Sequence, residues 1–295
     1  MILGIDVGYS HTKVWSKDGE FSFKSTIEEG SLDVFNSIQI EYQGNSYTIG
    51  ENNNNSLYDT NVNKIESLNF KLCLYTAIAK AMKDNVEDVK IVTGLPASYY
   101  SSQKDALIKE LKDKTVVMAI NGQPRKFTIT DVLVFPQSSG VLLLNPEKLN
   151  GDVCVVDIGG FTVDVSFFVN KKLKKLDTVE LGMNVFAKEL MNEIKSKYGV
   201  AYDVLRADDI LDSKEIVVNN RGINIEELIN TVLKRHANVI ENRLMGMKEY
   251  NTSKHIFIGG GSLRLARYLD SEIDKDTIYT NSKAFYKLGV SKFNG

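Results

Sequence analysis

The sequence predicts an α/β protein with two domains, and three observations lead to that prediction. A phrase made of an apolar strand, an Asp, a Gly-containing turn and a second strand occurs twice, around Asp6 and around Asp157. Strand and helix periodicities alternate in both halves of the chain, which is typical of sheets covered by helices. With 295 residues, the chain is long for one hydrophobic core and comfortable for two.

The composition excludes several classes of protein. Hydrophobic residues make up 43% and charged residues 25% of the chain, as in a globular protein, and no stretch approaches the ~18 apolar residues of a membrane span. A net charge of −2 argues against sequence-independent binding to DNA, which needs a local excess of Lys and Arg. The residues from Met1 to Asp6 do not resemble a signal peptide. Cys73 and Cys154 are expected to be buried, reduced thiols. We therefore expect a cytoplasmic protein that binds neither membranes nor nucleic acid directly.

The first half is predicted to alternate strands and helices after an opening hairpin. In chain order these are strands at 2–8, 12–16 and 20–25, a hairpin of 37–42 and 46–49, a helix at 64–82, a strand at 89–93, a helix at 103–111 and strands at 115–120 and 125–135. A further helix is predicted to start at Pro136, because the missing N–H of proline costs nothing in a first turn. The Asn-rich run 51–56 is expected to be a flexible loop, with a surface contact as the alternative.

The second half repeats the alternation. Its predicted elements are a strand at 151–157 with its hairpin partner, helices at 184–198 and 204–211, a β excursion at 214–225, a long helix from 225 and a strand–turn–helix unit at 255–268. The basic run 171–175 is expected to be a charged turn rather than a binding patch. Asn224 and Glu227 form a capping pair before the long helix. His236 lies on the apolar stripe of that helix, so a core histidine is expected rather than a ligand.

The first repeated turn has the residues of a phosphate loop. If the two hairpins face one another, two carboxylates and two sets of turn N–H groups surround one small volume, as a metal-bound polyphosphate requires. Gly8 allows a tight reversal, and Ser10, His11 and Thr12 offer N–H and hydroxyl donors to phosphate oxygens. Lys13 is expected to reach the β and γ phosphates. The alternative is an ordinary hairpin with an exposed lysine.

The second repeated turn differs in detail but allows the same contacts. Gly159 and Gly160 permit close backbone approach, and Thr162 adds a hydroxyl. Asp164 occupies the place in this hairpin that Lys13 has in the first. The two turns together therefore predict a nucleotide-binding protein.

A magnesium ion is the cofactor that this pattern predicts beside the nucleotide. Mg²⁺ prefers hard oxygen ligands, keeps several waters and touches few protein carboxylates. Asp6 and Asp157 are therefore expected to hold the ion through its waters, the alternative for Asp157 being a plain turn former at a strand end. A third turn, Gly259-Gly260-Gly261-Ser262, follows a strand and offers N–H groups to the α-phosphate or the adenosine.

Gln137 is the candidate for orienting a water in line with the γ-phosphate, a role that Gln has in some nucleotide hydrolases. Its alternative role is a hydrogen bonder at a helix start. Because a neutral amide positions water but is a poor base, slow turnover is expected. The sequence has no Walker-type Gly-x-x-x-x-Gly-Lys-Ser/Thr and no His/Cys cluster with metal-ligand spacing.

The order of these features resembles the actin, chaperone and sugar-kinase ATPase fold. A first phosphate loop, a linking helix, a second phosphate loop, an adenosine loop and a closing helix correspond to 4–13, 136–144, 155–165, 258–262 and 282–287. Within this superfamily the chain resembles the ParM/StbA group of plasmid-segregating bacterial actins, at Tyr47–Glu51, Thr93–Tyr100, Asp157–Asp164 and Ala284–Gly289. Gln137 departs from that group, which often has Glu there, whereas eukaryotic actin has Gln.

The resemblance implies an α/β, actin-like ATPase fold, in which two similar domains with small inserted subdomains flank a nucleotide cleft. Domain I is expected at 1–150 with an outer insert at about 31–63, domain II at 151–275 with an insert at about 199–223, and the segment 276–295 returns to domain I. The implied nucleotide-binding residues are Gly8, Tyr9, Ser10, His11, Thr12, Lys13, Gly159, Gly160, Phe161, Thr162, Asp164, Gly182, Gly259, Gly260, Gly261 and Ser262. The implied catalytic residues are Gln137, Asp157 and Asp6, the last two also as metal ligands through water.

The resemblance further implies a filament-forming ATPase that uses ATP, with GTP as an alternative, and Mg²⁺. Monomers would assemble head to tail, and hydrolysis would destabilise the polymer. Plasmid partition is implied through a small DNA-binding adaptor of ParR type, so the protein itself need not touch DNA. The alternatives are a small-molecule kinase of the same superfamily and a phage or cell-shape bacterial actin.

Overall fold

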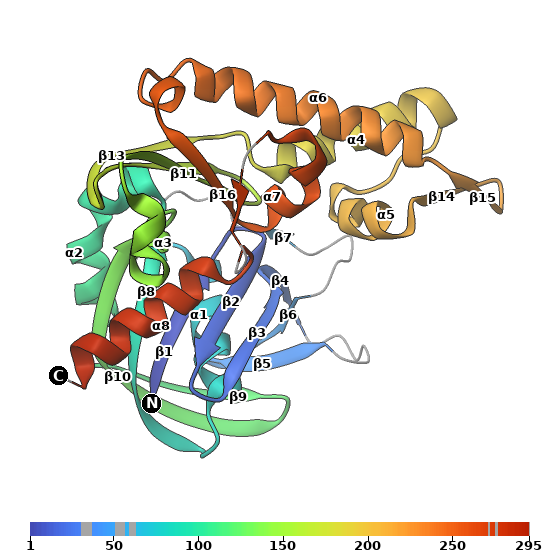
Figure 1. Ribbon diagram of the computed structural model, residues 1–295. Coiled ribbons are helices and arrows are strands. Elements are labelled where there is room, and N and C mark those ends of the chain that lie inside the picture. The colour runs from blue at the N-terminus through green and yellow to red at the C-terminus, as the bar shows by residue number, and fades with distance from the viewer. Residues whose placement is uncertain (31–36, 51–56, 59–62, 271, 275–276, 295) are drawn as a thin grey trace.

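The computed structural model describes residues 1–30, 37–50, 57–58, 63–270, 272–274 and 277–294. Within these ranges two main β-sheets, each packed against helices, lie one above the other (Figure 1). The Asn-rich run 51–56 and parts of the expected outer insert 31–63 lie outside the described residues.

The first sheet contains the N-terminal hairpin and has the strand order β3-β2-β1-β8-β10-β9-β5-β6-β4-β7. Its strands are β1 (Ile2–Val7), β2 (His11–Ser16), β3 (Gly19–Lys24), β4 (Thr26–Glu29), β5 (Ile38–Tyr42), β6 (Asn45–Ile49), β7 (Leu57–Tyr58), β8 (Val86–Leu95), β9 (Lys114–Ile120) and β10 (Gln123–Pro136). β8 runs parallel to both β1 and β10, so these three strands end at the same edge of the sheet. Asp6 and Gln137 meet at that edge, because each stands at the end of one of these strands.

Helices pack on both faces of this sheet: α1 (Leu68–Ala81) and α8 (Thr280–Phe293) lie on opposite faces, and α2 (Tyr100–Leu111) contacts β10 (Figure 1). Strand alternation assigns the faces, since Leu3 and Ile5 belong to the core that α1 covers while Gly4 points to α8. A Cβ atom at Gly4 would lie 2.1 Å from the carbonyl oxygen of Ser282, so only glycine lets α8 pack this closely. The C-terminal helix therefore packs directly on the N-terminal strand.

The second sheet contains the second hairpin and has the strand order β13-β12-β11-β16-β17. Its strands are β11 (Asp152–Ile158), β12 (Val163–Val169), β13 (Lys172–Val179), β16 (Lys254–Ile258) and β17 (Glu272–Ile273). Its helices are α4 (Met183–Tyr198), α5 (Ala207–Ser213), α6 (Glu226–Met245) and α7 (Gly260–Leu265), and the small hairpin β14 (Glu215–Val218) and β15 (Arg221–Asn224) follows α5. Val156 and Ile158 pack toward the core that α4 and α6 cover, whereas Val153 and Val155 pack against Val141 and Leu149 on the other face.

Most predicted strands and helices are confirmed to within a few residues, but the helix expected from Pro136 is wrong. β10 continues through Pro136, and the N–H of Gln137 donates to the carbonyl of Leu95 at 2.9 Å. The chain then turns at Ser138, which has a φ of +68°, and only the short helix α3 (Val141–Leu144) follows. Proline fits a strand end because it lacks the N–H that a ladder bond would need.

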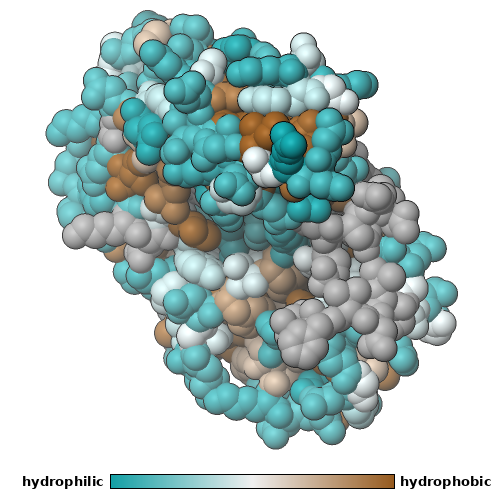
Figure 2. All heavy atoms as spheres, turned by 90° about the vertical axis from the view of Figure 1, so that its right-hand side faces the viewer, coloured by the Kyte–Doolittle hydropathy of each residue, from teal (hydrophilic) through white to brown (hydrophobic). Residues whose placement is uncertain are grey.

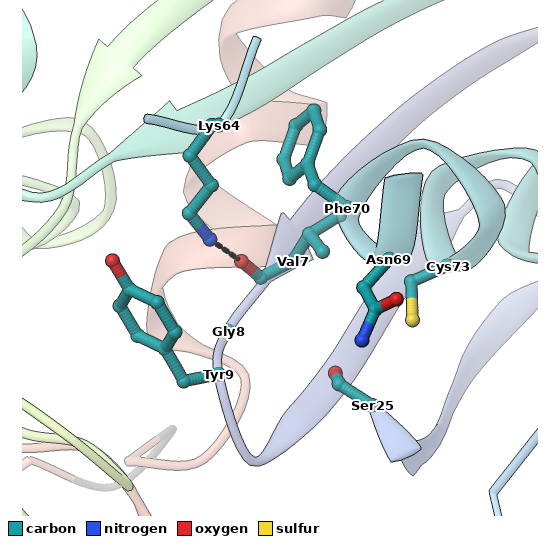
Figure 3. A pocket seen from close by; sticks show the side chains of 8 residues that line it. All are labelled: Val7, Gly8, Tyr9, Ser25, Lys64, Asn69, Phe70 and Cys73. Carbon is teal, nitrogen blue, oxygen red and sulfur yellow. Dashed lines mark hydrogen bonds between the residues drawn. The ribbon is translucent and has the colours of Figure 1, made fainter. Parts of the chain in front are cut away.

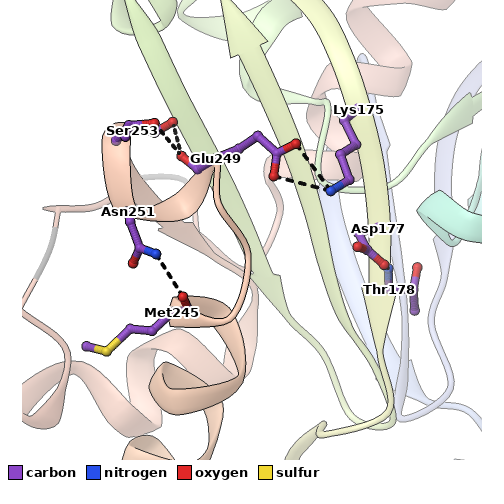
Figure 4. Close-up of polar contacts among 8 residues, drawn as sticks. Lys175, Asp177, Thr178, Met245, Glu249, Asn251 and Ser253 are labelled. Carbon is purple, nitrogen blue, oxygen red and sulfur yellow. Dashed lines mark hydrogen bonds and ion pairs between the residues drawn. The ribbon is translucent and has the colours of Figure 1, made fainter.

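The basic run 171–175 is only in part a turn, which corrects a second prediction. Asn170 and Lys171 both have positive φ and form the turn, and β13 begins at Lys172. Two residues with positive φ are typical of the tight turns that match strand twist. Lys175, within β13, pairs with the carboxylate of Glu249 at 3.2 Å (Figure 4).

The long helix α6 confirms the apolar stripe and the core position of His236, which is buried. The amide oxygen of Asn224 accepts a bond from the N–H of Glu226 at 3.0 Å, and not from Glu227 as the capping pair predicted. Cys73 and Cys154 are both buried, as expected, and form no disulfide with each other. None of the helices in the described ranges is long and apolar enough to span a bilayer.

Hydrophilic side chains dominate the face of the molecule that Figure 2 shows. Large hydrophobic side chains that are exposed are spread over several elements of the described part of the chain, among them Val86, Val117, Val217, Val239, Met245 and Leu263.

Candidate functional site

The two repeated turns have the same internal geometry. In the first, the N–H of Gly8 donates to the carbonyl of His11 at 3.1 Å, and in the second, the N–H of Gly159 donates to the carbonyl of Thr162 at 2.9 Å. Asp6 is the cross-strand neighbour of Lys13 in the first hairpin, as Asp157 is of Asp164 in the second. The shared spacing in the sequence therefore reflects a shared position in two hairpins.

The two turns also contact each other directly, as the sequence predicted. A Cβ atom at Gly160 would lie 2.4 Å from the Cβ of Ser10, and real Cβ atoms essentially never come this close to another heavy atom. The rings of Tyr9 and Phe161 pack beside this contact, with centroids 5.3 Å apart. Glycine at 160 is therefore required for the two hairpins to approach as they do.

The structure brings together the predicted residues Asp6, Asp157 and Gln137. Asp6 and Asp157 are 3% and 9% exposed. Nε2 of Gln137 donates to Oδ1 of Asp6 at 2.6 Å. Nδ2 of Asn281 donates to Oδ2 of Asp157 at 2.7 Å and lies 3.4 Å from Oδ2 of Asp6. The amide of Asn281 thus connects the carboxylates of the two sheets, and the amide of Gln137 is bonded to Asp6.

The buried carboxylate of Asp157 is in an environment that favours a nearby positive charge. Burial raises the pKa of Asp157 to about 7, and the nearby Asp6 and Asp164 add to the effect, while Lys13 opposes it. A buried carboxylate is stabilised by a cation or a proton, because desolvation penalises its charged form. The site is therefore suited to bind a positive ion.

His11 is neutral in this environment. Burial, together with the neighbouring Lys13, lowers the pKa of its ring to about 4. Its Nδ1 is hydrogen-bonded to the hydroxyl of Ser10 at 2.8 Å. The first turn therefore presents one cationic side chain, Lys13, which is half-buried next to the carboxylates.

Asp164, which is predicted to be a nucleotide-binding residue, links the two sheets through the hydrogen bonds of its carboxylate. Its Oδ1 accepts bonds from the N–H of Ala97 at 3.0 Å and from the hydroxyl of Thr178 at 2.6 Å. The hydroxyl of Thr162 donates to Oδ2 at 3.0 Å, so this predicted phosphate donor is used here as well. Three donors around one buried carboxylate leave it little capacity to bind a ligand.

Two residues predicted to bind nucleotide, Thr12 and Ser262, have hydroxyls that are bonded within the protein, which leaves their backbone N–H groups for the predicted role. Thr12 is fully buried and its hydroxyl is bonded to that of Ser25 at 2.9 Å. Strand alternation explains this, because the side chain at position 12 points to the same face as Val14. Ser262 is in the first turn of α7, and its hydroxyl donates to the carbonyl of Ile258, as serine in helices often does.

The third Gly-rich turn passes directly beside Asp157. A Cβ atom at Gly259, which has a φ of +87°, would lie 2.3 Å from Oδ1 of that carboxylate. Gly261 packs against Ile158, whereas a Cβ atom at Gly260 would meet open space. The third turn therefore lies at the predicted site, and Gly260 is the residue of this turn with open space beside it.

Gly182 packs against the second turn and is hydrogen-bonded to it. Its N–H donates to the carbonyl of Phe161 at 3.0 Å, and the next two N–H groups of α4 donate to Gly159 and Gly160. A Cβ atom at Gly182 would lie 2.4 Å from the backbone of Phe161. The start of α4 thus holds the turn in place through its backbone.

Lys64 contributes to the site, although its sequence context did not indicate it. It is 3% exposed, its Nζ donates to the carbonyl of Val7 at 2.6 Å, and it lies 4.5 Å from the ring centroid of Tyr9 (Figure 3). It lines a small pocket behind the first turn with Val7, Gly8, Tyr9, Ser25, Asn69, Phe70 and Cys73. A lysine beside an apolar helical pattern is normally exposed, so no local signal indicated this role.

Asn281 and a group of three serines were not predicted from the sequence either. The hydroxyl of Ser166 in β12 is bonded to those of Ser138 at 2.6 Å and Ser139 at 2.9 Å, and all three residues are fully buried. These bonds join the two sheets next to Gln137. A polar residue early in a helix, such as Asn281, is expected to cap the helix, so its contact with the carboxylates had no signal in the sequence.

The oxygen atoms at the site fit a hard cation such as Mg²⁺. Among the described residues there is no group of three or more His, Cys, Asp and Glu side chains that could hold a metal. The carboxylates of Asp6 and Asp157 and the amides of Gln137 and Asn281 nevertheless lie together, and the buried Oδ1 of Asn281 has no hydrogen-bond partner within the described ranges. Such oxygens are the ligands and water acceptors that Mg²⁺ prefers.

Two domain families match this chain. Residues 4–140 match the N-terminal domain of actin-like proteins, and residues 155–271 match the C-terminal domain of the MreB-like archaeal actin homologue. The chain is an actin-like protein. The expected α/β, actin-like ATPase fold is thereby confirmed.

Curated relatives of this actin-like protein come from archaea and from a bacterium. The archaeal actin homologs of Thermoplasma acidophilum and Thermoplasma volcanium are 25% and 24% identical, and each alignment covers 89% of this chain and 88% of the relative. Cell division protein FtsA of Neisseria meningitidis is 27% identical over 70 residues, which are 24% of this chain and 17% of the length of FtsA.

Solved structures of similar fold include archaeal and bacterial actins. The crystal structure of an archaeal actin homolog has a TM-score of 0.83 at 22% identity and covers 99% of both chains, and its complex with ADP has a TM-score of 0.82 at 21% identity. A 15-stranded ParM filament from Clostridium botulinum has a TM-score of 0.83 at 19% identity, covering 98% of this chain and 99% of the other. At these identities the likeness establishes the fold of this actin-like protein.

Proposed function

We propose that this actin-like protein binds Mg–ATP between its two repeated turns, hydrolyses it slowly and assembles into filaments. The observation that carries the proposal is the meeting of Asp6 and Asp157, one from each sheet, at the contact between the turns. The structures of an archaeal actin homolog with ADP and of a ParM filament support it. ATP is the proposed nucleotide, with GTP as the alternative.

In this proposal the two halves of the chain supply complementary contacts. The backbones of the first and second turns and the Lys13 side chain bind the phosphates, and the third turn lies on the side of the nucleoside. Domain I is proposed at 1–150, domain II at 151–275, and 276–295 as a segment returning to domain I. The outer inserts at about 31–63 and 199–223 are proposed as filament contacts.

Asp6, Asp157 and Gln137 are the proposed catalytic residues. Mg²⁺, held by Asp6 and Asp157 through its waters, would offset the negative charge on the phosphates. Nε2 of Gln137 is bonded to Asp6, which fixes the amide and leaves its Oε1 to accept a hydrogen bond from a water. Because an amide orients water without taking its proton efficiently, hydrolysis should be slow and should lag behind assembly.

The proposed cellular role is plasmid partition in the cytoplasm. A small DNA-binding adaptor of ParR type would connect filament ends to a centromere-like site. The net charge of −2 is in keeping with an actin that does not bind DNA itself. Cys73 and Cys154 form no disulfide with each other, which suits a reducing compartment.

Sedimentation combined with phosphate release tests the proposed function. The protein should pellet with Mg-ATP and remain in the supernatant with Mg-ADP or without nucleotide, and phosphate release should follow assembly. Asp157→Ala should abolish phosphate release, while Asp152→Ala, an exposed change in the same strand, should not. A soluble protein whose turnover requires an added metabolite would instead indicate a small-molecule kinase, and unchanged phosphate release by Asp157→Ala would refute the metal assignment.

A further inference from the structure

Asn281 touches a carboxylate of each sheet with one amide group. Its Nδ2 donates to Oδ2 of Asp157 at 2.7 Å and lies 3.4 Å from Oδ2 of Asp6. The side chain is buried, with 5% of the residue exposed. It comes from α8, which packs on the first sheet, so the bridge joins three separate parts of the chain.

The orientation of this amide is determined by the carboxylates. Oδ1 of Asn281 is buried without a hydrogen-bond partner among the described residues, and it lies beside Gly140, where an added Cβ atom would be 3.3 Å away. A buried acceptor without a partner is costly, so the contact of the N–H groups with the two acids must outweigh that cost. The amide therefore supplies the partial positive charge that two neighbouring carboxylates require.

The first turn of α8 is held so that Asn281 stays at this position. The hydroxyl of Thr280 donates to Oδ2 of Asp274 at 3.2 Å, and Nζ of Lys148 donates to Oδ1 of the same residue at 3.0 Å. Asp274 is buried, and its N–H donates to the carbonyl of Phe257 in β16. Contacts within the protein thus fix Asn281 relative to both sheets.

We infer that the amide of Asn281 acts in place of a cation at this site: its N–H groups donate to Asp157 and Asp6, the two carboxylates that would hold Mg²⁺ through its waters. This inference rests on the proposed function. Amide and cation compete for the same carboxylate oxygens, so the amide sets the concentration of Mg²⁺ that the site requires. Asn281 is a positioning residue, and removing its amide should weaken the metal-free state and strengthen the binding of Mg²⁺.

Thermal unfolding of the full chain with and without Mg²⁺ tests this inference. Asn281→Ala and Asn281→Asp are compared with wild type and with Asn294→Asp, an exposed change at the other end of the same helix. Each protein is unfolded in EDTA, in Mg²⁺ alone, and in ADP with increasing Mg²⁺. Both Asn281 variants should have a lower Tm than wild type in EDTA. Their Tm should rise more than that of wild type when Mg-ADP is added. The Mg²⁺ concentration for half-maximal stabilisation should fall about tenfold for Asn281→Ala and further for Asn281→Asp, since a hydrogen bond to a charged group no longer opposes the cation.

The outcomes separate this inference from the proposed function. Wild-type protein that shows neither stabilisation nor calorimetric heat with Mg-ADP would refute the nucleotide site and the inference together. A normal wild-type response, combined with an unchanged or increased Mg²⁺ requirement in Asn281→Ala, would refute the inference alone. Should Asn281→Asp fail to fold, Asn281→Ala and Asn281→Ser provide the same comparison, and a merely structural role would lower the Tm equally with and without Mg²⁺.

Discussion

The backbone N–H of Ala97 donates a hydrogen bond of 3.0 Å to Oδ1 of Asp164, and this bond ties the loop after β8 in the first sheet to β12 in the second. Burial raises the pKa of Asp164, while its hydrogen bonds from Thr178, Ala97 and Thr162 oppose that shift. The carboxylate therefore acts as a fixed point between the two halves of the molecule.

Asp164→Asn should lower the free energy of unfolding by about 2 kcal/mol, because an amide cannot accept from all three donors and leaves at least one of them unpaired. Urea denaturation monitored by far-UV circular dichroism measures this change. Asp152→Asn, an exposed change at the start of β11, should stay within about 0.5 kcal/mol of wild type. Equal stabilities for the two variants would show that the link contributes nothing.

Gly160→Ala should separate the two turns, because its Cβ would lie 2.4 Å from the Cβ of Ser10. We expect a loss of stability of about 1–3 kcal/mol, as for other overpacked sites. Ser10→Gly removes the opposing Cβ, so the double variant Gly160→Ala/Ser10→Gly should regain part of that loss. A double-mutant cycle on unfolding free energies measures the coupling, and strictly additive effects would contradict a direct contact.

Gln137→Ala should still assemble with Mg-ATP but should disassemble more slowly than wild type. The variant lacks the amide that is hydrogen-bonded to Asp6, so phosphate release should be about 100-fold slower. Disassembly should be slower because it follows phosphate release. Light scattering and phosphate release, recorded on the same sample, measure both steps. Gln123→Ala, an exposed change in β10, is the matched control. Wild-type disassembly by Gln137→Ala would leave Gln137 with a purely structural role.

His236 should make the protein less stable as the pH falls below neutrality. Burial lowers the pKa of the folded-state ring, against the opposing effect of Glu189 and of the carbonyls of Leu181 and Gly182. Below pH ~6.5 the unfolded chain therefore binds a proton that the folded chain does not, which costs up to about 1.4 kcal/mol per pH unit until the folded ring also titrates. His236→Gln has no ring to titrate, so between pH 7.5 and 5.5 the free energy of unfolding of wild type should fall more than that of the variant. Parallel pH profiles of the two proteins in urea denaturation would contradict the prediction.

Patterns within short segments predicted most of the elements and the core of the site. The two hairpins have strand alternation, a terminal Asp and a glycine turn within a dozen residues, so their likeness is visible in the sequence. The meeting of Asp6 with Asp157 could be inferred from that likeness alone. Long helices such as α6 were equally clear, because a stripe of apolar residues must face a core.

Side-chain direction at single positions was less predictable. Thr12, Asp164 and Ser262 lie in the expected turns or next to them, yet each is bonded to a partner within the protein. A motif indicates where a residue lies along the chain, whereas strand alternation and helix geometry decide to which side its hydroxyl or carboxylate points. Pro136 illustrates the same limit, since proline suits both a helix start and a strand end.

By itself the sequence determined that two similar hairpins and alternating strands and helices form an α/β protein, because local periodicity and turn chemistry are set by neighbouring residues. Only the tertiary structure decided which groups surround the paired carboxylates. Asn281 lies 275 residues from Asp6, and Lys64 lies 57 residues from Val7, yet packing of α8 and of the segment before α1 brings each to the first turn. Contacts over such separations depend on how whole helices pack on the sheets, and no local pattern records that packing.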